Sequence, residues 1–145
     1  MKNLRKLKGD ASFRKFYRKE NKNFSSIIVF AKKEKLKNLI IYDAINKLLR
    51  KNKILAPNLY KENYREGYIE IQDFGNETIF KILNNKKNNK TYYLKKIIKI
   101  LNQIQLIKDT KIKNFKKANY VIPKYDSNIL IKEANLFCDW YAKKK

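Results

Sequence analysis

The chain of 145 residues contains no histidine and a single cysteine, Cys138. Without histidine, no mechanism can use an imidazole base and no metal site can use a histidine ligand. A lone cysteine cannot form a disulfide within the chain, which fits a reducing compartment. Because Cys138 lies among Leu136, Phe137 and Trp140, we expect it to be a buried structural thiol and not a nucleophile.

Long apolar segments are also absent. No run of residues approaches the roughly 20 apolar residues of a membrane span, and residues 1–8 lack the apolar stretch of a signal peptide. The length is typical of one domain with a single core. We therefore expect a cytoplasmic protein with no membrane partner.

Acidic residues are scarce, with 13 Asp and Glu against 36 Lys and Arg and a net charge of +23. Such a charge attracts polyanions, so a small basic nucleic-acid-binding protein that stacks bases on its ten tyrosines is one interpretation. However, the basic residues are 31 Lys and only 5 Arg, and they accompany 18 Asn and 19 Ile. All three abundant residue types have A- and T-rich codons. A genome-wide composition bias would raise the net charge of almost any protein in this way, so the charge is weak evidence and nucleic-acid binding is kept as the alternative function.

The first half of the sequence predicts a sheet with one inserted helix. Aromatic and β-branched residues at 13–18 and 25–31 indicate an antiparallel hairpin around a polar turn. From 36 to 52, apolar residues recur at spacings of three and four, as in an amphipathic helix. Beyond the helix-ending Pro57, residues 58–60 and 67–72 are typical of short strands, and the second alternates polar and apolar side chains.

The second half predicts helices only, at residues 77–84, 91–108 and about 126–141, with Asp126 or Ser127 as the last N-cap. Residues 109–120 are expected to form a basic loop. The apolar stripe of the helix at 91–108 needs a partner surface to cover it. The fold class is therefore α+β, an antiparallel sheet with one helix followed by helices.

One stretch near the N-terminus suggests a ligand. Gly9, Asp10, Ala11 and Ser12 form a predicted turn of small residues, where a backbone can approach a ligand closely and offer amides to a phosphate. Arg14 and Arg18 follow at an even spacing, so on a strand both can face one anion. A basic hairpin that faces solvent is the alternative, and composition alone favours it.

The segment GDASFRKFYR at 9–18 resembles the opening of bacterial aminoglycoside-phosphotransferase-like sugar kinases, particularly the anomeric N-acetylmuramate and N-acetylglucosamine kinases. The resemblance continues in the same order with SSIIVF, NKLLRKNKILAP, GYIEIQDFG and EANLFCDWY, and it covers essentially the whole chain. It implies a protein-kinase-like fold. Residues 1–73 would form a five-stranded antiparallel N-lobe with one helix, and residues 74–145 the hinge exit and first helices of a C-lobe, with ATP in the cleft.

The resemblance also implies roles for individual residues. The turn at 9–12 would cover the ATP phosphates, and Arg14 and Arg18 would contact them. The hinge, whose backbone meets adenine, would be Glu70, Ile71, Gln72 and Asp73. Kinase-like folds usually carry a phosphate-binding Lys on the third strand, but here that position is Phe30, so Lys32 or an Arg would supply the charge. Asp43 can pair with such a cation, although an exposed acid on a lysine-rich helix is the favoured interpretation.

The residues that perform phosphoryl transfer are missing from the sequence. No His-Gly-Asp type loop supplies a catalytic Asp, and no later motif supplies the Asn and Asp that hold Mg²⁺. The DFG at 73–75 comes too early and is interpreted as a turn, and Glu133 is given no catalytic role. The resemblance therefore implies the ATP-binding portion of an amino-sugar kinase, inactive alone. The chain would then be a fragment of an interrupted gene, or half of a split enzyme whose second polypeptide carries the catalytic loop. Mg²⁺ and the sugar would bind only with a complete C-lobe. A pseudokinase interaction module is the third interpretation.

Overall fold

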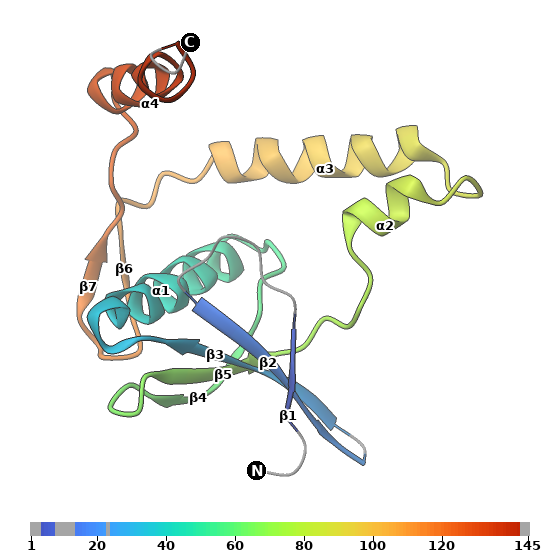
Figure 1. Cartoon of the computed structure of the whole chain (residues 1–145), viewed down its shortest axis with the longest axis vertical. Helices are drawn as coiled ribbons and strands as arrows, with labels where there is room; N and C mark the ends of the chain where they lie inside the picture. The colour runs from blue at the N-terminus through green and yellow to red at the C-terminus, as the bar shows by residue number, and fades with distance from the viewer. Residues whose placement is uncertain (1–3, 8–13, 23, 143–145) are drawn as a thin grey trace.

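The computed structural model describes residues 4–7, 14–22 and 24–142. Its main feature is a five-stranded antiparallel sheet with strand order β1-β2-β3-β5-β4 (Figure 1). The strands are β1 (Leu4–Lys6), β2 (Arg14–Asn21), β3 (Phe24–Ala31), β4 (Leu59–Asn63) and β5 (Tyr68–Gln72). The α+β class is confirmed, and the sheet is consistent with the kinase-like N-lobe that the resemblance implies.

Helix α1 (Lys37–Lys51) follows β3 after a short 3-10 turn at Lys33–Lys35, and it packs against the sheet. The other helices come later, as α2 (Ile79–Asn84), α3 (Lys90–Gln105) and α4 (Ser127–Trp140). Each of these three begins with a side chain that accepts a hydrogen bond from the first turn, supplied by Thr78, Asn89 and Asp126. The prediction of Asp126 as an N-cap is confirmed.

The core lies between α1 and one face of the sheet. In β3, Ile27, Val29 and Ala31 are buried, while the residues between them face the opposite side. Ile69 and Ile71 of β5 continue this apolar layer, as the alternating pattern predicts. Leu39 of α1, which is fully buried, packs against the layer, and partly buried side chains close its edges: Leu7, Phe16, Leu36, Tyr42, Leu59 and Phe115.

The prediction of a loop at 109–120 was wrong. Strands β6 (Lys111–Lys113) and β7 (Asn119–Val121) pair there as an antiparallel hairpin. Asn114, which is buried, organises the turn, because its side chain accepts a hydrogen bond from the Lys116 N–H and its carbonyl accepts one from Lys117. Lys117 adopts a φ of 60°, a left-handed conformation that the lysine-rich sequence does not indicate. The hairpin packs against α1, so residues on both sides of the predicted 73/74 division are in contact.

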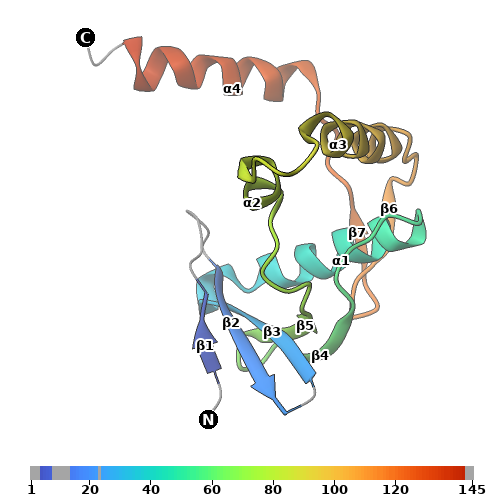
Figure 2. The same ribbon diagram turned by 90° about the vertical axis from the view of Figure 1, so that its right-hand side faces the viewer.

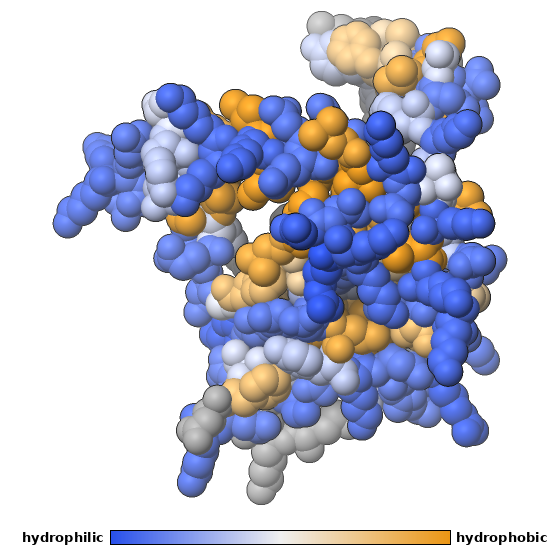
Figure 3. Space-filling view, turned by 180° about the vertical axis from the view of Figure 1, so that it is seen from behind, coloured by the Kyte–Doolittle hydropathy of each residue, from blue (hydrophilic) through white to orange (hydrophobic). Residues whose placement is uncertain are grey.

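The later helices leave their apolar side chains uncovered. None of α2, α3 and α4 contains a buried residue, and α4 extends away from the sheet (Figure 2). Figure 3 shows hydrophobic side chains at the surface in the part of the molecule that holds these helices, beside an opening. Many large apolar side chains of α3 and α4 are exposed as a result. Cys138 of α4 is exposed, so the prediction of a buried thiol was wrong, because that prediction required a cover over α4.

No helix in residues 4–7, 14–22 and 24–142 is both long enough and apolar enough to cross a membrane.

Candidate nucleotide site

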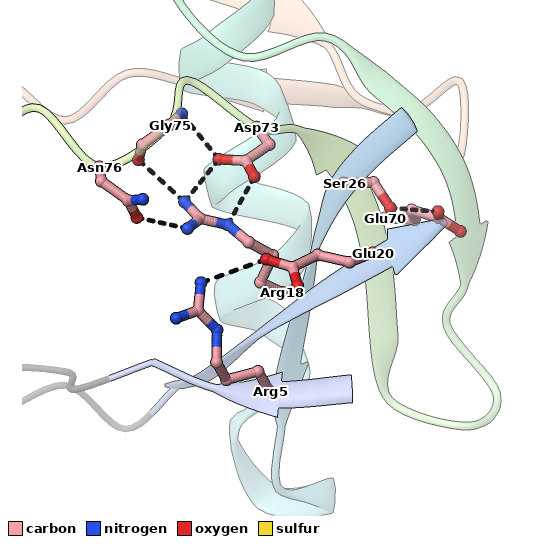
Figure 4. Close-up of polar contacts among 8 residues, drawn as sticks. All are labelled: Arg5, Arg18, Glu20, Ser26, Glu70, Asp73, Gly75 and Asn76. Atoms are coloured by element: carbon pink, nitrogen blue, oxygen red, sulfur yellow. Dashed lines mark hydrogen bonds and ion pairs between the residues drawn. The ribbon is translucent and has the colours of Figure 1, made fainter. Parts of the chain in front are cut away.

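Arg18 of β2 connects the sheet to the turn that follows β5 (Figure 4). Its guanidinium Nε lies 2.6 Å from Oδ2 of Asp73, and Nη2 donates hydrogen bonds of 2.9 Å to Asp73 Oδ1 and to the Gly75 carbonyl. Nη1 donates to the side chain of Asn76. We call these four residues the Arg18 cluster. The side chains of Arg18 and Asp73 are only 6% and 4% exposed, so the pair is shielded from water.

The Arg18 cluster holds Asp73 in its charged form. Burial opposes ionisation of the Asp73 carboxyl, but the hydrogen bonds from Arg18 and the Gly75 N–H, together with the positive charge of Arg18, outweigh it. The pKa of Asp73 therefore lies below its ordinary value of 3.8. The Gly75 N–H donates to Asp73 Oδ1 at 2.8 Å, so DFG forms a turn between β5 and α2, as expected.

The turn presents an open stretch of backbone next to the sheet. The Gly75 N–H and C=O are both occupied within the Arg18 cluster. Among the described residues, by contrast, the backbone N–H and C=O of Phe74 make no hydrogen bond, and its ring is 49% exposed. One free donor beside one free acceptor, on a turn that a buried ion pair fixes, is an arrangement that can meet the edge of a planar heterocycle.

The four predicted hinge residues occupy different environments. Glu70 and Ile71 lie inside β5, paired with β3 on one side and β4 on the other, and Gln72 ends the strand with its N–H bonded to the Asn58 carbonyl at 2.9 Å. Asp73 is the first residue beyond the strand. The hinge role of these residues stays a prediction, and the open backbone at Phe74 directly follows them.

The Glu70 side chain is directed to the sheet face opposite the core. It accepts a 2.5 Å hydrogen bond from Ser26 Oγ and lies 3.1 Å from Lys19 Nζ. Burial opposes its ionisation, but these two donors outweigh it and lower the pKa of Glu70 below 4.5. Glu70 therefore connects β2, β3 and β5 on one face of the sheet, whereas Arg18 lies on the other face.

The predicted phosphate contacts are only partly described. Gly9, Asp10, Ala11 and Ser12 lie outside the described residues. Arg14 and Arg18 sit opposite the core residues Ala31 and Ile27 in the β2–β3 register, so they share the core-side face of β2. Different groups hold them, however. Arg14 lies 4.9 Å from the centre of the Tyr42 ring, whereas Arg18 is held by the cluster described above. As phosphate contacts both stay predictions, with Arg18 committed to a structural role.

Phe30, which occupies the position of the usual third-strand lysine, and Lys32, which is considered as its substitute, also differ in position. Phe30 is 37% exposed and faces away from the core, while Lys32 is exposed immediately after β3.

The prediction that Asp43 is an exposed acid was wrong, because it is only 2% exposed. Asp43 occurs one turn after Leu39 on the buried side of α1, and Lys47 one turn further on reaches its Oδ2 at 2.8 Å. The buried Asp43 carboxylate is therefore paired with the positive charge of Lys47.

Sequence reasoning missed the partners of Arg18. Asp73 follows it by 55 residues, and no local pattern links a strand arginine to such a distant turn. Within the described part of the chain, no group of three or more His, Cys, Asp or Glu residues is placed to hold a metal ion. Glu133 is exposed on α4 and accepts a hydrogen bond from the Tyr125 hydroxyl.

No model of a known protein family matches the chain. The chain is 26% identical over 133 residues to the N-acetylmuramate/N-acetylglucosamine kinase of Pseudomonas putida. The aligned segment covers 92% of this chain and 36% of that kinase, so the chain spans about a third of the relative's length. The similarity includes both the sheet and the helices, and it supports a kinase-like origin for the chain.

Proposed function

We propose that the chain is the ATP-binding portion of a phosphotransferase that acts on an amino sugar. The observation that carries the proposal is the turn after β5, where Arg18 and Asp73 fix the backbone beside an unpaired N–H and C=O at Phe74. The similarity to the Pseudomonas putida kinase supports it by covering 92% of the chain. In this proposal adenine meets the turn at 73–74, and the loop at 9–12 covers the phosphates.

In this proposal the chain binds the nucleotide but does not carry the residues that catalyse phosphoryl transfer. In this proposal, the catalytic Asp and the residues that hold Mg²⁺ and the sugar belong to a C-lobe and come from outside these 145 residues. The exposed apolar faces of α3 and α4 support this, because helices of this length are marginally stable in water unless their apolar side packs against something. The chain alone is then inactive as a kinase.

ATP should bind at the core-side edge of the sheet. In an amide NMR titration of the isotope-labelled chain, we expect the largest shifts at residues 7–18 and 72–76, with small shifts in β4 and α4. Replacing Phe74 by proline removes the N–H that meets adenine and should weaken ATP binding by roughly tenfold. Leu55→Pro is the matched control, because Leu55 is 82% exposed and its N–H also makes no hydrogen bond to any described residue. Shifts confined to lysines over the whole surface would contradict a specific ATP site.

A further inference from the structure

The face of the sheet opposite the core is hollowed and unusually rich in aromatic and basic side chains. A groove of about 880 Å³ lies there. We call this surface the outer face. It consists of the residues that line the groove and the strand residues whose side chains lie on the same face of the sheet. The groove residues come from all five strands and the β4–β5 turn: Leu4, Tyr17, Lys19, Asn21, Ile28, Phe30, Lys61, Asn63, Glu66, Tyr68 and Glu70.

The strand register places three rings on adjacent strands. Phe30 of β3 is directly opposite Tyr68 of β5, and Tyr17 of β2 is opposite Ile28, two residues from Phe30. Directly opposed residues on antiparallel strands point to the same face, with Cβ atoms about 5 Å apart. Phe30 is 37% exposed. The outer face therefore offers a row of rings across the centre of the sheet, where planar groups can stack.

Lysines surround these rings. Lys15 is opposite Phe30, Lys6 is opposite Tyr17, and Lys19 and Lys61 line the groove itself. Two carboxylates lie among them. Glu70 is buried and already satisfied by Ser26 and Lys19, which leaves Glu66 as the exposed acid of the groove. The outer face thus carries an excess of positive charge at its solvent-exposed tips.

We propose that the outer face binds single-stranded nucleic acid. Bases would stack on Phe30, Tyr17 and Tyr68, and the phosphates between them would meet the surrounding lysines, the combination by which sheets and grooves bind single strands. Bases in a duplex are already stacked and cannot reach these rings. The overall charge of +23 adds a general attraction, but the proposal depends on the local interleaving of rings and lysines on one face. It is independent of the ATP site, which lies at the core-side edge.

The aromatic part is tested with a fluorescein-labelled U12 RNA and the full chain, measured by fluorescence anisotropy at fixed salt. Replacing Tyr17 and Phe30 by serine should weaken binding by roughly tenfold or more. Tyr92→Ser is the matched control, since Tyr92 of α3 is 50% exposed and the centre of its ring lies 4.4 Å from Lys96 Nζ, yet it is outside the outer face. The control should bind normally. Circular dichroism verifies that each variant is folded. If the serine variant is not folded, Phe30→Leu is used in its place, because leucine removes the ring and keeps an apolar side chain.

The electrostatic part is tested by the salt dependence. If about four lysines neutralise phosphates, log affinity for U12 should fall with log salt at a slope of about −3. Lys15→Gln with Lys61→Gln should reduce that slope to about half, whereas Lys90→Gln with Lys99→Gln on α3 should leave it unchanged. A saturating excess of ATP should not displace the RNA. Equal losses in both lysine pairs, equal binding of a 12-base-pair duplex, or no effect of the aromatic variants would each overturn the proposal.

Discussion

Replacing Arg18 by methionine should lower the free energy of unfolding by about 3 kcal/mol. Methionine keeps much of the side-chain volume but leaves the Asp73 carboxylate buried without its charged partner. It also removes the donors to the Gly75 carbonyl and the Asn76 side chain. Because Arg18 and Asp73 are almost fully buried, little water is available to compensate. Urea unfolding followed by circular dichroism measures the loss.

Arg5→Met is the matched control. Arg5 is opposite Arg18 on the neighbouring strand and pairs with Glu20 at 3.2 Å, but the side chains of Arg5 and Glu20 are both more than half exposed. Such surface pairs contribute at most about 1 kcal/mol. If Arg5→Met and Arg18→Met destabilised the chain equally, the Arg18 cluster would not be a structural anchor.

The pH dependence of stability provides a second readout of the Arg18 cluster. The pKa of Asp73 is lower in the folded chain than its ordinary value of 3.8, so the unfolded chain binds the proton first. The stability that Asp73 contributes is therefore present above about pH 4 and is lost as the pH falls through the folded pKa. In Arg18→Met this acid-dependent loss should shrink, measured as unfolding free energy between pH 6 and pH 2.5.

We expect the chain to self-associate through the exposed apolar face of α4. Replacing Phe137 and Trp140 by serine should abolish this association while leaving the stability of the sheet unchanged. The two side chains are 64% and 71% exposed, and an uncovered apolar helix face tends to find another surface. Because α4 buries no residue, its change should alter the unfolding free energy by no more than about 0.5 kcal/mol. Sedimentation velocity over a concentration series measures the association.

Leu55→Ser with Val121→Ser is the control for this experiment. These residues are 82% and 67% exposed but lie outside α4, so their replacement should not change association. High salt should strengthen association of the unmodified chain, because it screens the repulsion between molecules of charge +23. Association that persists in the α4 variant would show that another surface is responsible.

Periodic apolar patterns predicted most of the fold. The strands at 24–31 and 68–72 and the helices at 37–51, 90–105 and 127–140 follow them closely. The pattern failed for β6 and β7, since strands of three residues are too short to show a period. It also failed for Asp43, because the sequence does not indicate that Lys47 would make burial of this acid tolerable.

The candidate site was less predictable than the fold. The segment around Asp73 can be located in the sequence from the strand that precedes it, but its geometry depends on Arg18, which is 55 residues away. The phosphate role of Arg18 relied on even spacing along a strand. Spacing gives the face on which a side chain lies, and the identity of its partner depends on tertiary structure. For the same reason, α4 was expected to bury Cys138 until its lack of a covering surface became visible.

The most direct test of the central claim is the unfolding of the chain in the presence of ATP. If the sheet and the turn after β5 form an ATP site, ATP at about 100 times its dissociation constant should raise the free energy of unfolding by about 2.7 kcal/mol. Inorganic triphosphate at the same ionic strength controls for general anion binding and should produce a much smaller change. An equal change with ATP and triphosphate, or no change with ATP, would contradict the assignment of an adenine-binding site.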